Sequence, residues 1–267
     1  MRADELIHPC RGVTPEEIAH YQEFGWVKLE GLVHPKLIRR LLEIGVGKLG
    51  QDGDSNPPLP VLQGFFNHAS ADALSDPALR PLVSALGRNA KSLMKRQPHV
   101  QVRYFAENFA VKLPAARESK HDGNRRTEFH HDYPNWQLDR SGGMAFWIAL
   151  TDMGPQMGTM SFVSRSHRLG VMGNYRNGDL LEVYPEILEH CTLTEPLSYR
   201  AGDATVHSNL TVHGAGLNLT DRPRWAYTVL VNPADARWNG APAEAYETAH
   251  MKVHQELDDE RFPIISR

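Results

Sequence analysis

The hydrophobic pattern of the chain changes near residue 99, and this change constrains the fold more than any other feature. Beyond it, HVQVRYFAENFAVKL alternates partly between apolar and polar residues, and short apolar runs recur between Gly, Pro, Asn and Asp up to residue 233. Alternation is the pattern of strands with one buried face, and many short strands separated by turn residues are typical of a barrel or jelly roll. The sequence therefore predicts a mainly β protein with flanking helices and a double-stranded β-helix (jelly-roll) core over residues 99–233.

Helix signals dominate the residues before this point. Thr14, Pro15 and Glu17 combine an N-cap, a proline in the first helical position and a capping-box glutamate, which predicts a helix over 15–24 ending at Gly25. Similar patterns predict the remaining elements, namely a strand over 26–29, an amphipathic helix from residue 35, a loop over 51–60, a helix over 76–96 and an inserted helix over 177–190.

We expect one domain over residues 1–267. Residues 1–98 are expected to form a mostly helical N-terminal extension packed on the jelly-roll core of 99–233. Residues 234–267 are expected to form a C-terminal extension of polar turns and a short helix.

Charge and cysteine content restrict the partners. The 267 residues carry 29 Lys and Arg against 32 Asp and Glu, so the composition does not favour nucleic acid as a partner. Only Cys10 and Cys191 are present, which disfavours a disulfide framework and favours the reducing cytoplasm. No apolar run is long enough to span a membrane, and the amino terminus lacks the pattern of a secretory signal. A small-molecule partner is the simplest expectation, and the oligomeric state is left open.

Three residues have the right chemistry for a metal site. In the segment EFHHDYPNW, His130 and Asp132 are two residues apart, so on a strand they would point to the same face while His131 points away. His213, in the short apolar segment TVHGAGLN, can supply a second imidazole. Two histidines and one carboxylate form a facial triad, which leaves three coordination positions open on Fe(II) for other ligands. By itself, the pair His130 and Asp132 could equally be a hydrogen-bonded pair on a surface strand.

Several further segments extend this pattern over nearly the whole chain: LVHPKLIRRLLE, AFWIALTD, GTMSFVSRSHR, HGAGLN and DRPRWAY. Together with EFHHDYPNW they resemble the phytanoyl-CoA dioxygenase family, within the 2-oxoglutarate-dependent oxygenase superfamily. The resemblance implies a cupin-like jelly roll that binds Fe(II) through His130, Asp132 and His213. It also implies 2-oxoglutarate and O2 as cosubstrates.

An arginine eleven residues after His213 matches the offset at which this family binds the distal carboxylate of 2-oxoglutarate, and this arginine is Arg224. A planar guanidinium suits the role because it can bind a carboxylate through two parallel hydrogen bonds and stays charged. Arg222 is the alternative, but an intervening proline means that the two arginines need not share a face.

The resemblance also implies the lining of the pocket. Trp147 and Asn108 occupy positions where the family lines the cosubstrate pocket, and Lys112 shares strand parity with Asn108 and is a reserve candidate. Trp136 and Tyr133, which follow Asp132 closely, are candidates for contact with the substrate. For Trp136, packing at the rim of the barrel is an equal alternative.

The chain departs from the family at two places. Many relatives have a serine two residues after the distal histidine, where this chain has Ala215, and either Tyr227 or Thr205 could supply the missing hydroxyl. The loop SRSHR also lacks the usual glycine before its serine. Related halogenases have a small residue in place of the carboxylate, so Asp132 disfavours halogenation.

The remaining histidines and two arginines are expected to have ordinary roles. These are His131 behind the ligands or at the surface, His207 as a plain strand residue, His68, His99 and His167 as structural residues, and Arg125 and Arg126 on a solvated loop or against an anionic substrate group.

The expected activity is oxidation, most simply hydroxylation, of a C–H bond in a small molecule. A biosynthetic or natural-product intermediate is preferred to a fatty acyl-CoA, because nothing in the sequence marks an acyl-CoA site. Two alternatives stay open: a non-oxidative metal-dependent cupin-like enzyme, and a binding protein that retains the fold without turnover.

Overall fold

A computed structural model describes residues 8–55, 65–95, 99–116, 123–173, 178–243 and 246–266. The helices are α1 (Pro15–Phe24), α2 (Pro35–Leu49), α3 (Arg80–Leu93), α4 (Leu180–Val183) and α5 (Ile187–His190), with short 3-10 turns η3 (Tyr133–Asn135), η4 (Pro155–Met157) and η5 (Ser166–Arg168). The strands are β1 (Trp26–Leu29), β2 (Asn67–Ala69), β3 (Val102–Lys112), β4 (Thr127–His130), β5 (Met144–Ala149), β6 (Met160–Ser164), β7 (Thr192–Leu193), β8 (Ala204–Ser208), β9 (His213–Ala215) and β10 (Arg224–Pro233).

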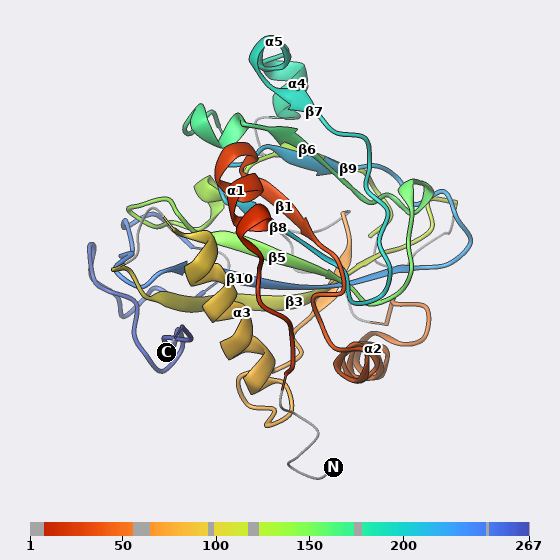
Figure 1. Ribbon diagram of the computed structural model, residues 1–267, viewed down its shortest axis with the longest axis horizontal. Coiled ribbons are helices and arrows are strands. Elements are labelled where there is room, and N and C mark those ends of the chain that lie inside the picture. Colours follow the sequence, from red (N-terminus) through yellow and green to blue (C-terminus); the bar gives the residue numbers. More distant parts are fainter. Residues whose placement is uncertain are drawn as a thin grey trace.

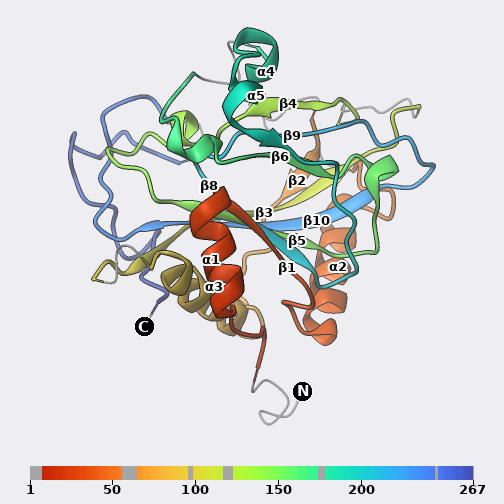
Figure 2. The ribbon, with the colours of Figure 1, turned by 45° about the horizontal axis from the view of Figure 1, so that its top comes forward.

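Two antiparallel sheets face each other and form the core of the fold. The major sheet has the strand order β1-β8-β5-β10-β3-β2, and the minor sheet has the order β4-β9-β6-β7 (Figures 1 and 2). In both sheets, strands that are distant in sequence are neighbours: β1 pairs with β8, and β4 pairs with β9. This arrangement is the jelly roll of a double-stranded β-helix, and the predicted fold class is confirmed.

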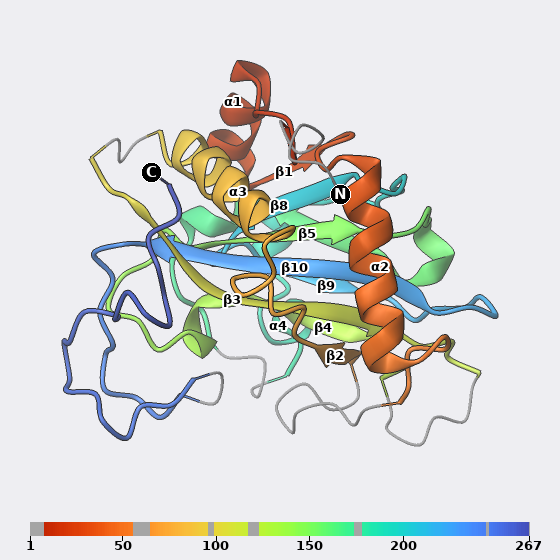
Figure 3. The same cartoon turned by 90° about the horizontal axis from the view of Figure 1, so that it is seen from below.

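The long helices α2 and α3 cover the outer face of the major sheet, and the short helices α4 and α5 pack against the minor sheet. Figure 3 shows α2 and α3 lying across the outer face of the major sheet. Leu41 of α2 and Leu86 of α3 belong to the same buried apolar cluster as Phe109, Phe146 and Tyr227 of the sheet. Burial of this apolar surface is the main force that holds the helices against the sheet. The opposite face of the major sheet is therefore left to face the minor sheet.

The first helix has the predicted ends. The Glu17 amide donates to the Thr14 hydroxyl at 3.3 Å, and the Thr14 amide donates to the Glu17 carboxylate at 2.8 Å, which completes the capping box. Gly25 ends the helix with φ +81°, and a Cβ there would lie 2.3 Å from His167 Nδ1. Both the left-handed backbone and the close approach require glycine at this position.

Some elements differ from the sequence-based expectation. The inserted segment forms two short helices, α4 and α5, because Pro185 interrupts the pattern after α4. The prediction of a short C-terminal helix was wrong, because residues 234–243 and 246–266 form turns and bends with isolated bridges. The N-terminal region contributes two edge strands to the major sheet as well as helices. Residues 56–60 of the predicted loop, residue 96 of the predicted helix and residue 177 of the predicted inserted helix lie outside the described residues.

None of the helices within the described ranges has the length and apolarity needed to cross a membrane.

Candidate active site

The inner face of the major sheet forms one wall of the candidate site. Side chains alternate between the faces of a strand, and residues that are opposite one another on neighbouring strands share a face. Trp147 and Ala226 pack with Phe162 and Ala215 of the minor sheet, so they mark the inner face. The register then places every second residue of β3, β10, β5 and β8 on that face.

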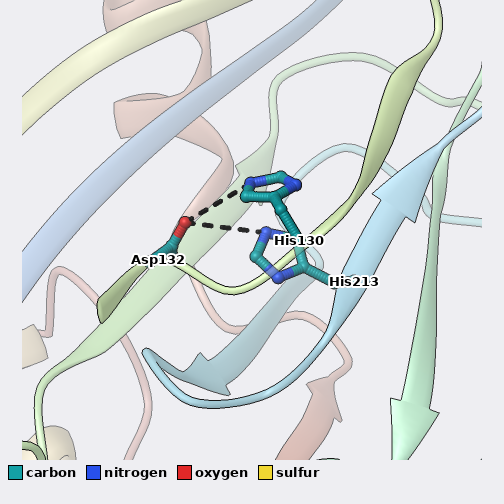
Figure 4. A group of neighbouring side chains, drawn as sticks. All are labelled: His130, Asp132 and His213. Atoms are coloured by element: carbon teal, nitrogen blue, oxygen red, sulfur yellow. Dashed lines mark ion pairs between the residues drawn. The ribbon is translucent and has the colours of Figure 1, made fainter. Parts of the chain in front are cut away.

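Three predicted metal-ligand residues meet against this wall. His130 is the last residue of β4 and His213 is the first of β9, and the pairing of these two strands sets the two histidines opposite each other. Their ring centroids are 4.4 Å apart. Asp132 Oδ1 lies 3.6 Å from His130 Nε2 and 3.9 Å from His213 Nε2 (Figure 4). One nitrogen from each ring and one carboxylate oxygen lie within 4.8 Å of one another, a spacing that could hold a metal ion.

The route by which Asp132 reaches the site differs from the strand argument. β4 ends at His130, and Asp132 has helical backbone angles (φ −76°, ψ −31°) at the start of η3. The side chain of Asp132 therefore reaches the two histidines because the chain turns after β4. The prediction that His130 and Asp132 share one face of a strand does not explain the contact. His131 between them is buried, and its Nε2 lies 2.7 Å from the Gly173 carbonyl oxygen.

Backbone carbonyls select the tautomer of both histidines. His130 Nδ1 lies 2.7 Å from the Glu128 oxygen, and His213 Nδ1 lies 2.9 Å from the Thr211 oxygen. A carbonyl oxygen can only accept, so each Nδ1 must carry the proton and donate it. The lone pair of each neutral ring is then on Nε2, directed at Asp132 Oδ1, as a metal-binding histidine requires.

The charges within the group also suit a divalent cation. Burial opposes ionisation of Asp132, but His213, His130 and His207 beside it bring its pKa well below the ordinary value. Burial, followed by the neighbouring His207 and His130, lowers the pKa of His213 well below its ordinary value. The carboxylate is thus ionised and the His213 imidazole is neutral over the physiological range.

His207 is a residue of this site that the sequence analysis missed. It lies on β8 with 3% of its surface exposed, and its Nε2 is 3.3 Å from Asp132 Oδ2. The two oxygens of Asp132 therefore have different partners, since Oδ1 faces His130 and His213. The sequence indicated only that His207 and Thr205 would point to the same face of a strand. Nothing in the local sequence indicated that this face would be the inner one.

Two buried cations lie at one end of the inner face. Arg224 and Lys112 are directly paired on β10 and β3, with exposed fractions of 3% and 0%. The Arg224 guanidinium donates to the Gly158 carbonyl and lies 5.1 Å from the centre of the Trp147 ring. Lys112 Nζ donates to Thr127 Oγ1 at 3.1 Å and to the Gly216 carbonyl at 2.9 Å.

Neither cation forms an ion pair with a carboxylate in the described part of the chain, and Arg224 Nε is buried without a hydrogen-bond partner. Burial lowers the pKa of Arg224 to about 10. Burial, and then repulsion from Arg224, lowers the pKa of Lys112 well below its ordinary value. Two unneutralised cations that share one buried place form a site for an anion.

The other pocket candidates occupy distinct places. Arg222 is exposed, whereas Arg224 is buried. Asn108 is on the inner face, but its Nδ2 donates to the Phe109 carbonyl at 3.1 Å and its Oδ1 accepts from the Thr228 hydroxyl. It lies four residues, about 13 Å, along β3 from Lys112. Lys112 is thus the member of the β3 pair that accompanies Arg224.

The two suggested replacements for a serine at Ala215 lie on different faces. Tyr227 packs in the outer cluster under the helices, so its hydroxyl cannot reach the inner face. Thr205 is on the inner face opposite Trp147, and its hydroxyl is 3.4 Å from that of Tyr199. Lys112 Nζ lies 3.5 Å from the Ala215 carbonyl, so an ammonium group is already beside this position.

The two candidates for substrate contact flank Asp132 differently. Tyr133 is half-buried, and its hydroxyl donates to the Leu138 carbonyl at 3.1 Å. Trp136 is 5% exposed and packs against Phe105, with ring centroids 5.4 Å apart, in an apolar cluster that includes Phe262. Packing at the rim of the barrel thus accounts for one side of Trp136.

The family profile described as phytanoyl-CoA dioxygenase (PhyH) matches residues 49–226, which is more than half of the chain. The chain belongs to the phytanoyl-CoA dioxygenase family. The sequence-based assignment is confirmed, and the chain is an enzyme of an oxygenase family. Among curated protein sequences, no match to this chain is found.

Solved structures of family-like enzymes share the fold. A non-heme α-ketoglutarate-dependent carbocyclase from nogalamycin biosynthesis, SnoK, is 24% identical with a TM-score of 0.72, and the alignment covers 94% of this chain and 96% of SnoK. The epimerase SnoN, in complex with Fe3+, α-ketoglutarate and nogalamycin RO, is 22% identical with a TM-score of 0.73, and the coverage is 94% and 97%. EctD from S. alaskensis in its apo form is 15% identical with a TM-score of 0.66, and the coverage is 88% and 82%. At these identities the likeness shows the fold.

Proposed function

We propose that this protein is a non-haem Fe(II)/2-oxoglutarate-dependent dioxygenase that oxidises a C–H bond of a small molecule. The observation that carries the proposal is the convergence of His130, Asp132 and His213 on one point between the two sheets. This point faces the inner face of the major sheet, which buries Arg224 and Lys112 without carboxylate partners in the described chain.

The three side chains fit Fe(II). The donor set has two imidazole rings and an ionised carboxylate oxygen, and the Glu128 and Thr211 carbonyls hold the Nδ1 protons so that each Nε2 faces the metal position. His207 donates to Asp132 Oδ2, which leaves Oδ1 for the metal and favours attachment through one oxygen. This set leaves coordination positions open for a bidentate 2-oxo acid and for O2.

Arg224 and Lys112 fit the distal carboxylate of 2-oxoglutarate. A guanidinium presents parallel N–H groups to a carboxylate, and the buried Nε of Arg224 has no other partner within the described residues. Trp147 lies against the guanidinium and restricts its orientation. The anion would neutralise both buried cations, and it would be held at a fixed distance from the metal.

The substrate would approach over the middle of the inner face. Four inward-facing residues are partly exposed there, in contrast to the buried ends of the same strands: Ala106 and Asn108 on β3, and Thr228 and Leu230 on β10. His130 and Asp132 have side-chain exposures of 15% and 19%, so the metal site can be reached from solvent. Tyr133 and Trp136, next to Asp132, remain the proposed substrate contacts at this mouth.

When bound, Fe(II), 2-oxoglutarate and O2 supply the oxidising power: the cosubstrate is converted to succinate and CO2, and the substrate C–H bond becomes C–OH in the simplest outcome. The role of the protein is to hold these groups in position and to exclude water from the site. SnoK and SnoN, by their descriptions, are a carbocyclase and an epimerase from nogalamycin biosynthesis. Their fold supports a biosynthetic intermediate as substrate here, with hydroxylation as the default reaction.

The test is formation of succinate from 2-oxoglutarate in the presence of Fe(II) and O2. We expect the activity in the wild-type protein and its loss in Asp132→Ala, which removes the only carboxylate of the set. Asp139→Ala is the matched control, because Asp139 is in the same segment and outside the site, and it should retain activity. Metal-dependent turnover of another kind without succinate would instead favour a non-oxidative enzyme, and binding of 2-oxoglutarate without succinate would favour a binding protein.

A further inference from the structure

Two buried asparagines flank one glycine on the inner face. The register of Met144 with Ser208 and Val231 continues by one residue, so Asn209, Gly143 and Asn232 lie side by side on β8, β5 and β10 or their direct extensions. The Asn209 amide donates to the Gly143 carbonyl at 2.9 Å, which confirms this extension. We call Asn209, Gly143 and Asn232 the amide row.

The two asparagine side chains of the amide row lack the hydrogen-bond partners that buried amides normally have. Asn209 and Asn232 are both 0% exposed, and the Oδ1 and Nδ2 of each have no hydrogen-bond partner in the structure as described. Buried polar groups are nearly always hydrogen-bonded, and an unpaired one costs stability. Four unpaired amide atoms in one row are therefore better explained by a ligand than by the needs of the fold.

The spacing of the row requires the glycine. A Cβ on Gly143 would lie 2.2 Å from Asn232 Oδ1 and 2.3 Å from a ring carbon of Trp136. The absence of a side chain thus leaves room for the amide of Asn232 beneath the indole of Trp136. This gives Trp136 a second contact surface besides its packing at the rim of the barrel.

The amide row lies on the substrate side of the metal. His207, which contacts Asp132, is two residues from Asn209 on the same face of β8, so the amide row is about 7 Å beyond it. Arg224 is eight residues from Asn232 along β10, about 26 Å away. A molecule of 2-oxoglutarate anchored at Arg224 cannot reach the amide row, which leaves it for the substrate.

The amide row itself is uncharged. The inner-face residues of the neighbouring row on β10, β5 and β8, which are Leu230, Ala145 and His207, include no Lys, Arg, Asp or Glu. The cation opposite Asn232 on β3, Arg103, is paired with Asp259 and also donates to the Phe262 carbonyl. A carboxamide offers one acceptor and a two-proton donor and carries no charge. Such groups recognise hydroxyl, carbonyl or ether oxygens and do not neutralise an ion.

We infer that Asn209 and Asn232 form a substrate-recognition site for a neutral, oxygenated part of the molecule, such as a hydroxyl or carbonyl group on a ring. The inference rests on the proposed function and specifies the substrate class for the same active site. It predicts that substrates with a carboxylate, phosphate or ammonium group at this end bind poorly.

The first experiment measures stability without ligand. Asn209→Leu and Asn232→Leu replace each amide by an isosteric apolar group, and Asn89→Leu is the control. Asn89 is also buried, with 5% exposed, but its amide accepts from Val13 N at 3.1 Å and donates to the Arg11 carbonyl at 2.8 Å. We expect Asn89→Leu to lower the melting temperature by about 2–10 °C, and the two variants of the amide row to leave it unchanged or to raise it.

If both amide-row variants lose as much stability as Asn89→Leu, the amides have a structural role and the inference is overturned. A smaller replacement, Asn→Ser at each position, repeats the measurement should leucine prevent folding. Each variant must still be stabilised by 2-oxoglutarate with Mn(II), which shows that the metal and cosubstrate sites are intact.

The second experiment measures succinate formation with matched probes on one ring: cyclohexane-1,2-diol and cyclohexanone against cyclohexanecarboxylate and cyclohexylamine. We expect the neutral pair to stimulate 2-oxoglutarate consumption, and each Asn→Leu variant to need about tenfold more probe, the effect of losing one hydrogen bond. The inference, but not the proposed function, would be overturned by any of three results: stimulation by a charged probe that equals or exceeds that of the neutral pair, no stimulation by the neutral pair, or an unchanged response of the variants. A wild-type protein that neither binds nor consumes 2-oxoglutarate would overturn the proposed function as well.

Discussion

Replacement of Arg224 by methionine tests the anion site most directly. The guanidinium is 3% exposed, one of its N–H groups is used by the Gly158 carbonyl, and its Nε has no partner within the described residues. Removing one partner of a buried, hydrogen-bonded charge pair costs about 3–5 kcal/mol. Because Lys112 remains beside the carboxylate, we expect the lower part of this range, a rise of about 100- to 1,000-fold in the Kd of 2-oxoglutarate.

Two further variants make the result specific. Arg224→Lys keeps the charge but loses the planar pair of donors, so a smaller rise in Kd of about 10- to 100-fold is expected. Arg222→Met removes an exposed arginine two residues away and should leave the Kd unchanged. Binding is measured by isothermal titration of 2-oxoglutarate into protein loaded with Mn(II), which occupies the metal site without turnover.

The ligand-free proteins supply a second measurement. The fold gains little from an arginine whose charge is buried without a carboxylate, and burial accordingly lowers the pKa of Arg224 to about 10. We expect Arg224→Met to unfold at the same denaturant concentration as the wild type, or at a higher one. A Kd within threefold of the wild-type value for Arg224→Met, or an equal loss for Arg222→Met, would show that the cosubstrate is bound elsewhere.

Three further predictions concern single contacts. His207→Phe removes the donor to Asp132 Oδ2, so the affinity for Mn(II) should fall by about 10- to 100-fold in a metal titration; unchanged affinity would show that His207 does not position the carboxylate. Burial lowers the pKa of Lys112 well below 10.5, so the protonated form that favours the anion is lost as the pH rises through this lowered pKa. The Kd of 2-oxoglutarate should then increase with pH. The ligand-free protein should gain stability up to pH 10.5, because in this range the unfolded chain binds a proton at Lys112 that the folded protein does not. An identical pH profile in Lys112→Met would show that Lys112 is not the cause of the pH dependence. Gly25→Ala forces a left-handed alanine against His167, and we expect a loss of about 2 kcal/mol or more in the free energy of unfolding; a denaturation midpoint equal to that of the wild type would contradict the steric argument.

Local chemistry was sufficient for the elements near the N-terminus and for most strands. The capping box of Thr14 and Glu17 and the stop at Gly25 act over a few residues, so they could be predicted with the helix ends. The inserted segment and the C-terminal residues were predicted less well, because weakly patterned polar segments take their conformation from what they pack against.

The family motifs identified His130, Asp132, His213 and Arg224, but the sequence argument for the first two was only partly right. A common strand face was expected, whereas Asp132 lies after the strand and approaches through a turn. The choice of Arg224 rather than Arg222 agrees with their burial, since one is inside and the other exposed. Whether these residues bind iron and 2-oxoglutarate stays a prediction until the titrations above.

By itself, the sequence determined the alternation of the strands, the ends of the first helix and the types of side chain available for a metal. Only the tertiary structure decided which of these side chains meet. The pairing of β4 with β9 brings His130 to His213, the pairing of β3 with β10 brings Lys112 to Arg224, and the register of β8, β5 and β10 aligns Asn209 with Asn232. Such contacts join residues far apart in the chain, and a shift of one residue in any pairing would turn the same side chains to the opposite face. Register is set by the packing of whole sheets, so no local segment contains it.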